Sequence, residues 1–347
     1  MKRTGNLLQY ITAYPNIRLA WLKTLRGKRN SPSAVRFARY LDVNLNQVQA
    51  RLNSLDPGWG NYRKFQIYDP KQRTISAAPI AERVMHHAIM NILAPVLERP
   101  LVYHSYACRH KKGTHAAVQQ AFHWSKSAGW FLKLDVRRYF DSIDHTVLYQ
   151  QLQHIIKDRS VLYLLYTLIK SYSTDVGKGL PIGNLTSQFF ANLYLSGMDH
   201  YILEQCRPRS YIRYMDDFVL WASNKEELQT DLHRITSYCQ RHLDLQLKPP
   251  VLAPVKDGLP FLGFLIRPQG IYLTRKSKRR MKKRARSITA ALANEHIDQE
   301  TAAMRAQSVH AAVKLARSRQ FRVQLWHGSS YGHESRQTRR QLEQQCV

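Results

Sequence analysis

Cysteine is scarce in this sequence, which has four in 347 residues. The four thiols, Cys108, Cys206, Cys239 and Cys346, lie far apart and form no Cys-x-x-Cys pair. A disulfide-rich secreted domain and a zinc finger both need closely spaced cysteines. The sequence therefore argues against both classes and indicates reduced thiols, as in a cytoplasmic protein.

Long apolar runs are also missing. No stretch reaches the roughly 18 apolar residues that a membrane-spanning helix needs, and the basic start, MKRTGNLLQYITAYPN, lacks the apolar core of a signal peptide. No repeat is visible at a period of about 20–50 residues. Hydrophobic residues nevertheless make up 44% of the chain, which is enough for a folded core. We therefore expect a folded cytoplasmic protein without a membrane partner.

Acidic residues are few. The chain has 24 Asp and Glu against 53 Lys and Arg, a formal net charge of +29. Such an excess repels itself unless a polyanion neutralises it, and nucleic acid is the commonest one. The charge is densest between residues 275 and 286, where nine of twelve residues are basic: Arg275, Lys276, Lys278, Arg279, Arg280, Lys282, Lys283, Arg284 and Arg286.

Hydrophobic periodicity predicts a mixture of helices and strands. Helices are expected over residues 1–55, 80–97, 146–171, 185–205 and 225–242, and from 274 onward. Asn224 is the expected N-cap of the helix that follows it. Strands are expected at 64–69 and 73–79 as a hairpin, at 131–136, at 211–222 as a hairpin, and at 259–266 as a pair. Because these elements do not alternate regularly, the fold class is α+β.

Three carboxylates carry the sharpest chemical signal. Asp216 and Asp217 lie at the turn of an apolar hairpin, framed by Tyr214–Met215 and Phe218–Trp221, and Asp135 ends a separate strand. An isolated Asp-Asp pair usually marks a solvated turn, but this apolar frame favours partial burial, which is costly without a cation. Oxygen-rich sites suit hard divalent ions, and two such ions about 3.5–4 Å apart assist in-line attack at phosphorus.

The motifs resemble those of a known enzyme family. Residues 214–217, YMDD, resemble the YxDD box of reverse transcriptases, and residues 132–145, LKLDVRRYFDSIDH, resemble their first aspartate motif. A basic hairpin, the single aspartate, a PxGxxxS segment, the paired aspartates and FLG follow one another in that family's order. The resemblance spans about residues 60–275.

One departure points to a subgroup. Most reverse transcriptases carry a QGxxxSP-type segment, whereas this chain has Ile182 before the glycine and Gln188 after the serine. These features, together with SYACRHKKGTHAAV at residues 105–118, resemble the reverse transcriptases of diversity-generating retroelements. The resemblance implies a right-hand polymerase with an N-terminal helical extension (1–55), interleaved fingers and palm (56–270), and a small basic helical thumb with a C-terminal tail (271–347).

The implied reaction is RNA-directed synthesis of complementary DNA with errors at template adenines, as in mutagenic retrohoming. By the same resemblance, Asp135, Asp216 and Asp217 are catalytic. Asp135, the Val136 carbonyl and Asp216 would ligate two Mg²⁺ ions, with Mn²⁺ as a substitute. The other implied contacts are to the nucleotide (Lys71, Arg73, Arg109, Phe140, Ile182, Gly183, Gln188), to the primer end (Phe261, Leu262, Gly263), and from the nine basic residues of 275–286 to the template–primer duplex. Lys248 is the nearest match to the family's general acid, although the usual following pattern is missing.

Phe140 and Ile182 carry the implied specificity. Phe140 falls where the family places the aromatic ring that excludes a 2′ hydroxyl; an ordinary core aromatic is the alternative. Ile182 replaces a glutamine that touches the incoming nucleotide, and an aliphatic side chain cannot form that hydrogen bond. The resemblance therefore implies looser discrimination between nucleotides.

The implied partners are a retroelement template RNA, an RNA–DNA template–primer duplex, deoxynucleoside triphosphates and a small basic oligomeric accessory protein. The implied location is the cytoplasm, and the implied origin of the gene is a bacterium or a phage. Two alternatives stay open. The first is a retron or group II intron-type reverse transcriptase. The second is a non-catalytic RNA-binding scaffold of the same fold, although a scaffold has no reason to keep three aspartates and Phe140.

Overall fold

The computed structural model describes residues 2–68 and 72–327. The chain forms two compact units. The first comprises Met1–His110, Lys133–Val219 and Gln229–Val251, and the second comprises Lys111–Leu132, Leu220–Leu228 and Leu252–Val347. The domain boundaries at residues 55 and 270 stay a prediction. No helix in the described part of the chain is both long and apolar enough to cross a membrane.

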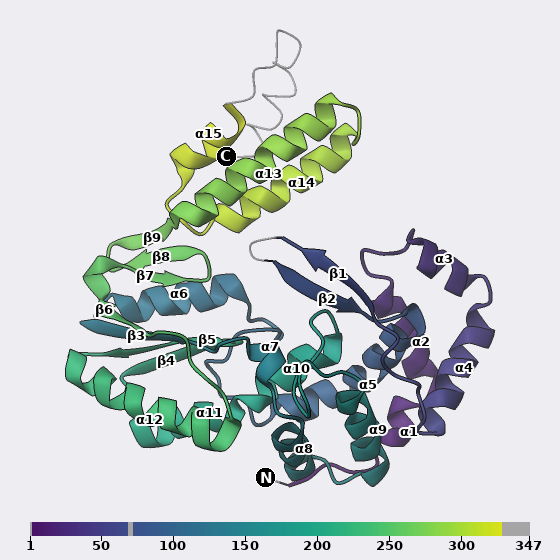
Figure 1. The fold of residues 1–347 in the computed structure, drawn as a ribbon. Helices are drawn as coiled ribbons and strands as arrows, with labels where there is room; N and C mark the ends of the chain where they lie inside the picture. Colours follow the sequence, from purple (N-terminus) through teal and green to yellow (C-terminus); the bar gives the residue numbers. More distant parts are fainter. Residues whose placement is uncertain (1, 69–71, 328–347) are drawn as a thin grey trace. The chain divides into compact units, whose positions relative to one another are not determined.

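The N-terminal region is helical, as the sequence predicts. Its helices are α1 (Leu8–Ile11), α2 (Tyr14–Thr24), α3 (Pro32–Ala38) and α4 (Leu41–Asn53). They pack against the long helix α5 (Ile80–Glu98), which lies beside α2 in Figure 1. Ile17, Leu45, Val84 and Ile89 are fully buried in this cluster. Burial of these apolar faces provides most of its stability.

The first predicted hairpin is confirmed. Strands β1 (Arg63–Ile67) and β2 (Arg73–Ala77) pair antiparallel, with Phe65 opposite Ile75. Arg73 is exposed at the start of β2. Lys71, which the sequence places near the tip, lies outside the described residues.

A four-stranded sheet carries the aspartates. Its order is β4 (Ser210–Tyr214), β5 (Asp217–Ala222), β3 (Trp130–Asp135) and β6 (Val251–Pro254). The predicted strand at 131–136 and the hairpin at 211–222 are therefore confirmed, whereas β6 was not predicted. Residues 218–222 of β5 are all buried, as in a central strand covered on both faces.

Eight further helices lie between β2 and β6 in the described chain, of which α6 belongs to the second unit. They are α6 (Thr114–Ser125), α7 (Tyr139–Ser142), α8 (His145–Ile155), α9 (Arg159–Lys170), α10 (Leu185–Tyr194), α11 (Ser196–Tyr201), a π-helix (Ile202–Cys206) and α12 (Lys225–Leu243). Asn224 caps α12 as expected, because its Oδ1 accepts a hydrogen bond from Glu227 N at 3.0 Å. The predicted helix at 185–205 is divided into α10, α11 and the π-helix.

The prediction of one helix over 146–171 is wrong. Helix α8 ends at Ile155 and α9 begins at Arg159. Between them the backbone pairs with the N-terminal segment: Thr4 N donates to Ile155 O at 2.9 Å, and Lys157 N donates to Thr4 O at 2.7 Å. Asp158 then caps α9. A continuous helix would lose these bonds, so the chain breaks here.

The second unit contains a three-stranded antiparallel sheet, β7 (Leu259–Phe261), β8 (Phe264–Arg267) and β9 (Gly270–Leu273). The pair β7–β8 was predicted and β9 was not. Three helices follow: α13 (Arg275–Ala293), α14 (Gln299–Val313) and α15 (Arg319–His327). Helices α13 and α14 lie side by side (Figure 1). The expected helical region from 274 is thus confirmed as three helices, with Asp298 capping α14.

Asp158 provides a test of how the N-terminal segment is anchored. Its Oδ2 accepts hydrogen bonds from Leu7 N and Leu8 N at 2.9 and 3.2 Å, and its Oδ1 accepts one from Val161 N at 3.3 Å. We expect Asp158→Ala to lower the free energy of unfolding by about 2–3 kcal/mol, because a helix cap and two further amide bonds are lost together. Urea unfolding measures this.

Asp144→Ala is the matched control. Asp144 caps α8 through Thr146 N and Val147 N only, at 2.8 and 2.9 Å. Its loss should cost about 1 kcal/mol, the value of an ordinary cap. Equal costs for the two variants would contradict a special anchoring role for Asp158.

Candidate active site

Asp135 reaches the site through the alternation of β3. Leu132 and Leu134 are buried on one face of the strand, so Lys133 and Asp135 point to the other. Asp135 is the last residue of the strand. Its side chain is 32% exposed, which leaves it open to a ligand.

The turn between β4 and β5 brings Asp216 and Asp217 to the same place. Met215, the residue before them, has a left-handed backbone (φ 58°). Val136 N donates to Asp216 O at 3.3 Å, which joins this turn directly to the end of β3. A backbone hydrogen bond thus joins Val136 and Asp216, which lie about 80 positions apart in the sequence, without the help of any side chain.

The two hairpin carboxylates, Asp216 and Asp217, lie in surroundings that are unfavourable for negative charge. Burial raises the pKa of Asp216, and the charge of Asp135 raises it further. Burial raises the pKa of Asp217 to about 7, although Lys133 opposes the shift with its Nζ 3.2 Å from Asp217 Oδ2. Asp217 Oδ1 is buried and has no hydrogen-bond partner among the described residues. This cluster would be stabilised by added positive charge.

Lys248 supplies part of that charge. Its Nζ donates to Asp135 Oδ1 at 2.5 Å, and its backbone N donates to Asp135 O at 2.8 Å. The lysine is positioned because Leu247 pairs antiparallel with Val136 beyond the end of β3. The residue that matched the family's general acid only weakly is therefore in direct contact with a predicted metal ligand.

The donor set fits a hard divalent cation. Asp135 and Asp216 offer carboxylate oxygens whose mutual repulsion a cation would relieve. Within the described residues, no group of three or more His, Cys, Asp and Glu side chains is gathered as a metal site. Asp217 instead pairs with Lys133. The residues thus suit an arrangement in which Asp135 and Asp216 hold metal and Asp217 adds charge nearby.

Three of the predicted nucleotide-contacting residues, Phe140, Ile182 and Gly183, are linked through one loop. Ser76 N in β2 donates to Ile182 O at 2.9 Å, and Leu180 N donates to Phe140 O at 2.8 Å. Gly183 has φ 120°, and a Cβ there would lie 2.9 Å from Ile75 Cγ2. Only glycine permits this close approach of hairpin and loop. The backbone therefore links β2 and the turn of Phe140 to the loop of Ile182.

Arg109 and Gln188 are placed less directly. Arg109 Nη1 donates to Val102 O at 2.7 Å and to Ser105 O at 3.0 Å, so this nitrogen stabilises its own loop. Gln188 is exposed on the first turns of α10, where its Oε1 accepts a 3.4 Å hydrogen bond from Cys108 Sγ. Their contacts with a nucleotide stay a prediction.

The predicted primer-end segment forms the turn between β7 and β8. Phe261 is fully buried, while Leu262 and Gly263 have left-handed backbones (φ 50° and 88°). Gly263 O accepts hydrogen bonds from Ser277 Oγ at 2.6 Å and from Thr274 Oγ1 at 3.1 Å. The turn is therefore fixed to the beginning of α13.

Helix α13 turns one apolar stripe inward and its cations outward. Ser277, Met281 and Ala285 are buried, whereas all nine cations except the half-buried Arg280 are exposed. A groove of about 1200 Å³ runs along α13 beside α15. None of its lining residues, all in the described part of the chain, is acidic. Its cations are Arg275, Lys278, Arg279, Lys282, Lys283, Arg286, Arg317, Arg319 and Arg322.

Comparison with known proteins decides the family. The reverse transcriptase family (RNA-dependent DNA polymerase) matches residues 63–266, more than half of the chain. The chain belongs to the reverse transcriptase family. The matched segment contains all three aspartates and the loop of Ile182. Family membership confirms the predicted enzyme class, RNA-directed DNA polymerase, and the mixed helix-and-strand fold of reverse transcriptases. The division into fingers, palm and thumb stays a prediction.

Individual relatives of this reverse transcriptase are distant. Protein YkfC of Escherichia coli (strain K12) is 25% identical over 260 residues, which span 60% of this chain and 68% of YkfC. The group II intron-encoded protein LtrA of Lactococcus lactis is 26% identical over 140 residues, 39% of this chain and 23% of LtrA. Apo telomerase from Candida tropicalis has a TM-score of 0.49 at 11% identity, covering 77% of this chain and 56% of that chain.

Two residues of the site were not singled out from the sequence. Lys133 pairs with Asp217, and Arg213 is fully buried behind the turn that carries the aspartates. The alternation of β3 could have placed Lys133 on the same face as Asp135. No local pattern predicts the side-chain partners of Arg213, because Asn192 lies in α10 and Asp199 lies in α11.

The Lys248–Asp135 pair gives a prediction about metal affinity in this reverse transcriptase. A cation on Asp135 competes with a metal ion for the same carboxylate. We expect Lys248→Met to lower the Mg²⁺ concentration at half-saturation about two- to fivefold, the value of a partly exposed ion pair. The rise of the unfolding temperature with Mg²⁺ measures it without any activity assay.

Lys178→Met is the matched control, because Lys178 also pairs with an aspartate, Asp244, instead of with Asp135, Asp216 or Asp217. Its Mg²⁺ half-saturation should equal that of the unaltered protein. An unchanged value for Lys248→Met would contradict competition at Asp135.

Proposed function

We propose that this reverse transcriptase serves a diversity-generating retroelement, copying a template-repeat RNA into complementary DNA that carries errors at adenines. The observation that carries the proposal is the loop of Ile182. It places an aliphatic residue, fixed by the bond from Ser76 N, within the network that also contains the backbone of Phe140. No side-chain hydrogen bond from Ile182 can test the incoming base, so base choice rests on shape.

The chain's own residues have distinct tasks in nucleotidyl transfer. Asp135 and Asp216 hold the metal, and Asp217 adds negative charge while paired with Lys133. The metal ions, Mg²⁺ or Mn²⁺, supply when bound the positive charge that lowers the pKa of the primer 3′ hydroxyl and neutralises the leaving pyrophosphate. Lys248, which contacts Asp135, would donate a proton to that leaving group once metal displaces it from the carboxylate.

Nucleic acid is held mainly through its phosphates. The cations of α13 and the groove beside α15 present positive charge that is not opposed by any acidic lining residue. Contacts of this kind are independent of base sequence and weaken steeply with salt. They suit a polymerase that must move along its template. The turn of Leu262 and Gly263 adjoins α13 and would meet the primer end.

The proposed partners follow from the same function. They are a retroelement RNA with its template–primer duplex, deoxynucleoside triphosphates, and a small basic oligomeric accessory protein. Phe140 would exclude ribonucleotides, with Arg73, Arg109 and Gln188 near the triphosphate and template base. Bacterial or phage origin belongs to this proposal as well.

An intron-type reverse transcriptase is the second candidate, because the group II intron-encoded protein LtrA is among the relatives. The two candidate classes share the three aspartates and differ at the loop of Ile182. The pattern of copying errors therefore separates them.

Primer extension on an RNA template tests catalysis. We expect Asp216→Asn to reduce extension at least about a hundredfold, because the metal loses a charged ligand that its partner Asp135 cannot replace. Asp175→Asn, an exposed acid outside the site, should extend like the unaltered protein. Equal extension by all three proteins would contradict the assignment of Asp216. An Asp216→Asn protein that bound RNA less well but extended the primer as before would also contradict it.

Sequencing the products tests the retroelement class. The unaltered protein should misincorporate mainly opposite template adenines, and Ile182→Gln should reduce those errors about three- to tenfold, because a side-chain amide can add roughly 1 kcal/mol of discrimination. Ile182→Val, which keeps an aliphatic side chain, should leave the error pattern unchanged. Accurate copying by the unaltered protein would favour the intron-type candidate, and an error pattern indifferent to Ile182→Gln would contradict the role of this residue.

A further inference from the structure

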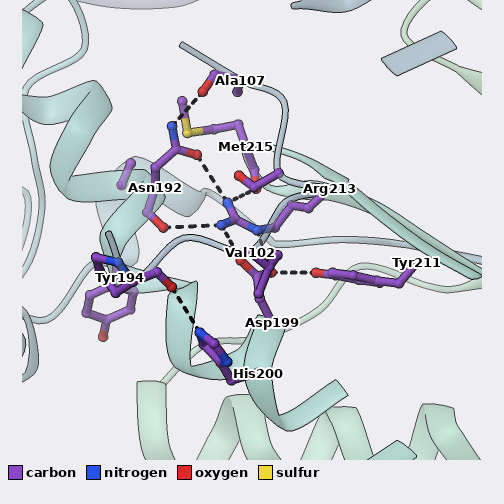
Figure 2. Close-up of polar contacts among 12 residues, drawn as sticks. Val102, Ala107, Asn192, Tyr194, Asp199, His200, Tyr211, Arg213 and Met215 are labelled. Atoms are coloured by element: carbon purple, nitrogen blue, oxygen red, sulfur yellow. Dashed lines mark hydrogen bonds and ion pairs between the residues drawn. The ribbon is translucent and has the colours of Figure 1, made fainter. Parts of the chain in front are cut away.

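Arg213 is the most completely bonded charged side chain behind the catalytic turn. It lies in β4, two residues before Met215, and is fully buried. Its guanidinium has five N–H bonds, and each has an acceptor (Figure 2). Nε and Nη2 donate to the two carboxylate oxygens of Asp199, at 2.7 and 2.5 Å. The remaining three donate to Asn192 Oδ1 (3.2 Å), Asn192 O (3.2 Å) and Met215 O (3.0 Å).

The acceptors come from rigid elements. Asn192 lies in α10, where its Nδ2 also donates to Ala107 O at 2.8 Å, and Asp199 lies fully buried in α11. Tyr211 donates its hydroxyl hydrogen to Asp199 Oδ1 at 2.6 Å. Figure 2 shows the guanidinium enclosed between Asn192, Asp199 and the backbone of Met215. We call Arg213, Asp199 and Asn192 the Arg213 clamp.

Stability alone does not account for the clamp. A buried ion pair is often no more stabilising than apolar side chains of the same volume. What an apolar group could not replace is the bond to Met215 O. That carbonyl belongs to the residue whose left-handed backbone (φ 58°) turns the chain into Asp216. Such a conformation persists in a non-glycine residue only when its surroundings determine it.

The backbone of Arg213 is fixed as firmly as its side chain. Arg213 N donates to His104 O, and Tyr106 N donates to Arg213 O, both at 2.9 Å. The guanidinium therefore acts from an immobile strand. Displacing the Met215 carbonyl would break a charge-assisted hydrogen bond from a fully buried guanidinium.

We infer that Arg213 is a positioning residue for nucleotidyl transfer: through the Met215 carbonyl, the Arg213 clamp holds the turn in the geometry that presents Asp216 to metal. The inference rests on the proposed role of Asp216 as a metal ligand. Arg213 itself touches no reacting atom. It prevents the turn from relaxing away from Asp135, so the two carboxylates stay close despite their repulsion.

Arg213→Lys is the main test variant, because lysine keeps the charge but has a single nitrogen that cannot bond Asp199, Asn192 and Met215 O together. We expect the Mg²⁺ concentration for half-maximal primer extension to rise about tenfold, as for other groups that orient a metal ligand. The KM for template–primer should stay unchanged, because α13 and its groove are untouched. A variant that merely folds less well would lose active enzyme without altering its Mg²⁺ requirement.

Tyr211→Phe is the matched control. Its phenyl ring keeps the packing of a fully buried residue, and it removes one bond to Asp199 without touching the turn. It should lower the unfolding temperature and leave the Mg²⁺ requirement unchanged. An equal Mg²⁺ shift in both variants, or none in Arg213→Lys, would overturn the inference.

Asn192→Ala covers the case in which Arg213→Lys does not fold. It keeps the backbone acceptor and the Asp199 pair but frees one side of the guanidinium, and it should raise the Mg²⁺ requirement about twofold to threefold. Stabilisation by Mg²⁺ in thermal unfolding provides a readout independent of activity. If the unaltered protein extends no primer, the proposed function fails. The clamp is then still judged by whether Arg213→Lys or Asn192→Ala weakens that stabilisation, and an unweakened response overturns it.

Discussion

The constraint on which this protein depends is the concentration of negative charge at one point of a strongly basic chain. Asp135, Asp216 and Asp217 occupy the end of β3 and the adjoining turn, where burial raises the pKa of both hairpin carboxyls. Lys133 pairs with Asp217 and Lys248 pairs with Asp135. The lysines and any bound metal ions would therefore compete for the same carboxylates. Loss of Lys133 would leave the largely buried Asp217 without its ion-pair partner.

Backbone geometry maintains this arrangement of charges. The turn of Met215 is joined to β3 by the bond from Val136 N, and Leu247 extends the same edge so that Lys248 meets Asp135. Gly183 allows the nucleotide loop to approach β2. In each case the local backbone conformation is held by a hydrogen bond or a close contact with residues far away in the sequence. The site is thus a property of the assembled sheet and loops, and no single motif could form it alone.

This dependence on distant partners explains what the sequence could predict. The strands at 131–136 and 211–222 were predictable because alternation and apolar runs are local, and the three aspartates were found for the same reason. The break at residues 156–158 was not, because it is caused by Thr4 and by the amides of Leu7 and Leu8, some 150 residues away. Strands β6 and β9 have four residues each and contain a residue that disfavours a strand, Pro254 in β6 and Gly270 in β9, so their sequences do not indicate strands. The pairing of Arg213 with Asp199 likewise requires α11 to be in place.

Helix α13 carries a concentration of positive charge on its exposed faces. Its buried stripe occupies positions 277, 281 and 285, while the groove cations recur at 275, 278, 279, 282, 283 and 286, which is the spacing of one helix face. Residues 276, 280 and 284 form a further basic stripe. The helix contains no Asp or Glu, so its neighbours at four-residue spacing repel one another. A polyanion bound along the helix would relieve this repulsion. Metal ions would supply the counter-charge of the acidic cluster, and a phosphate backbone would supply that of the basic helix.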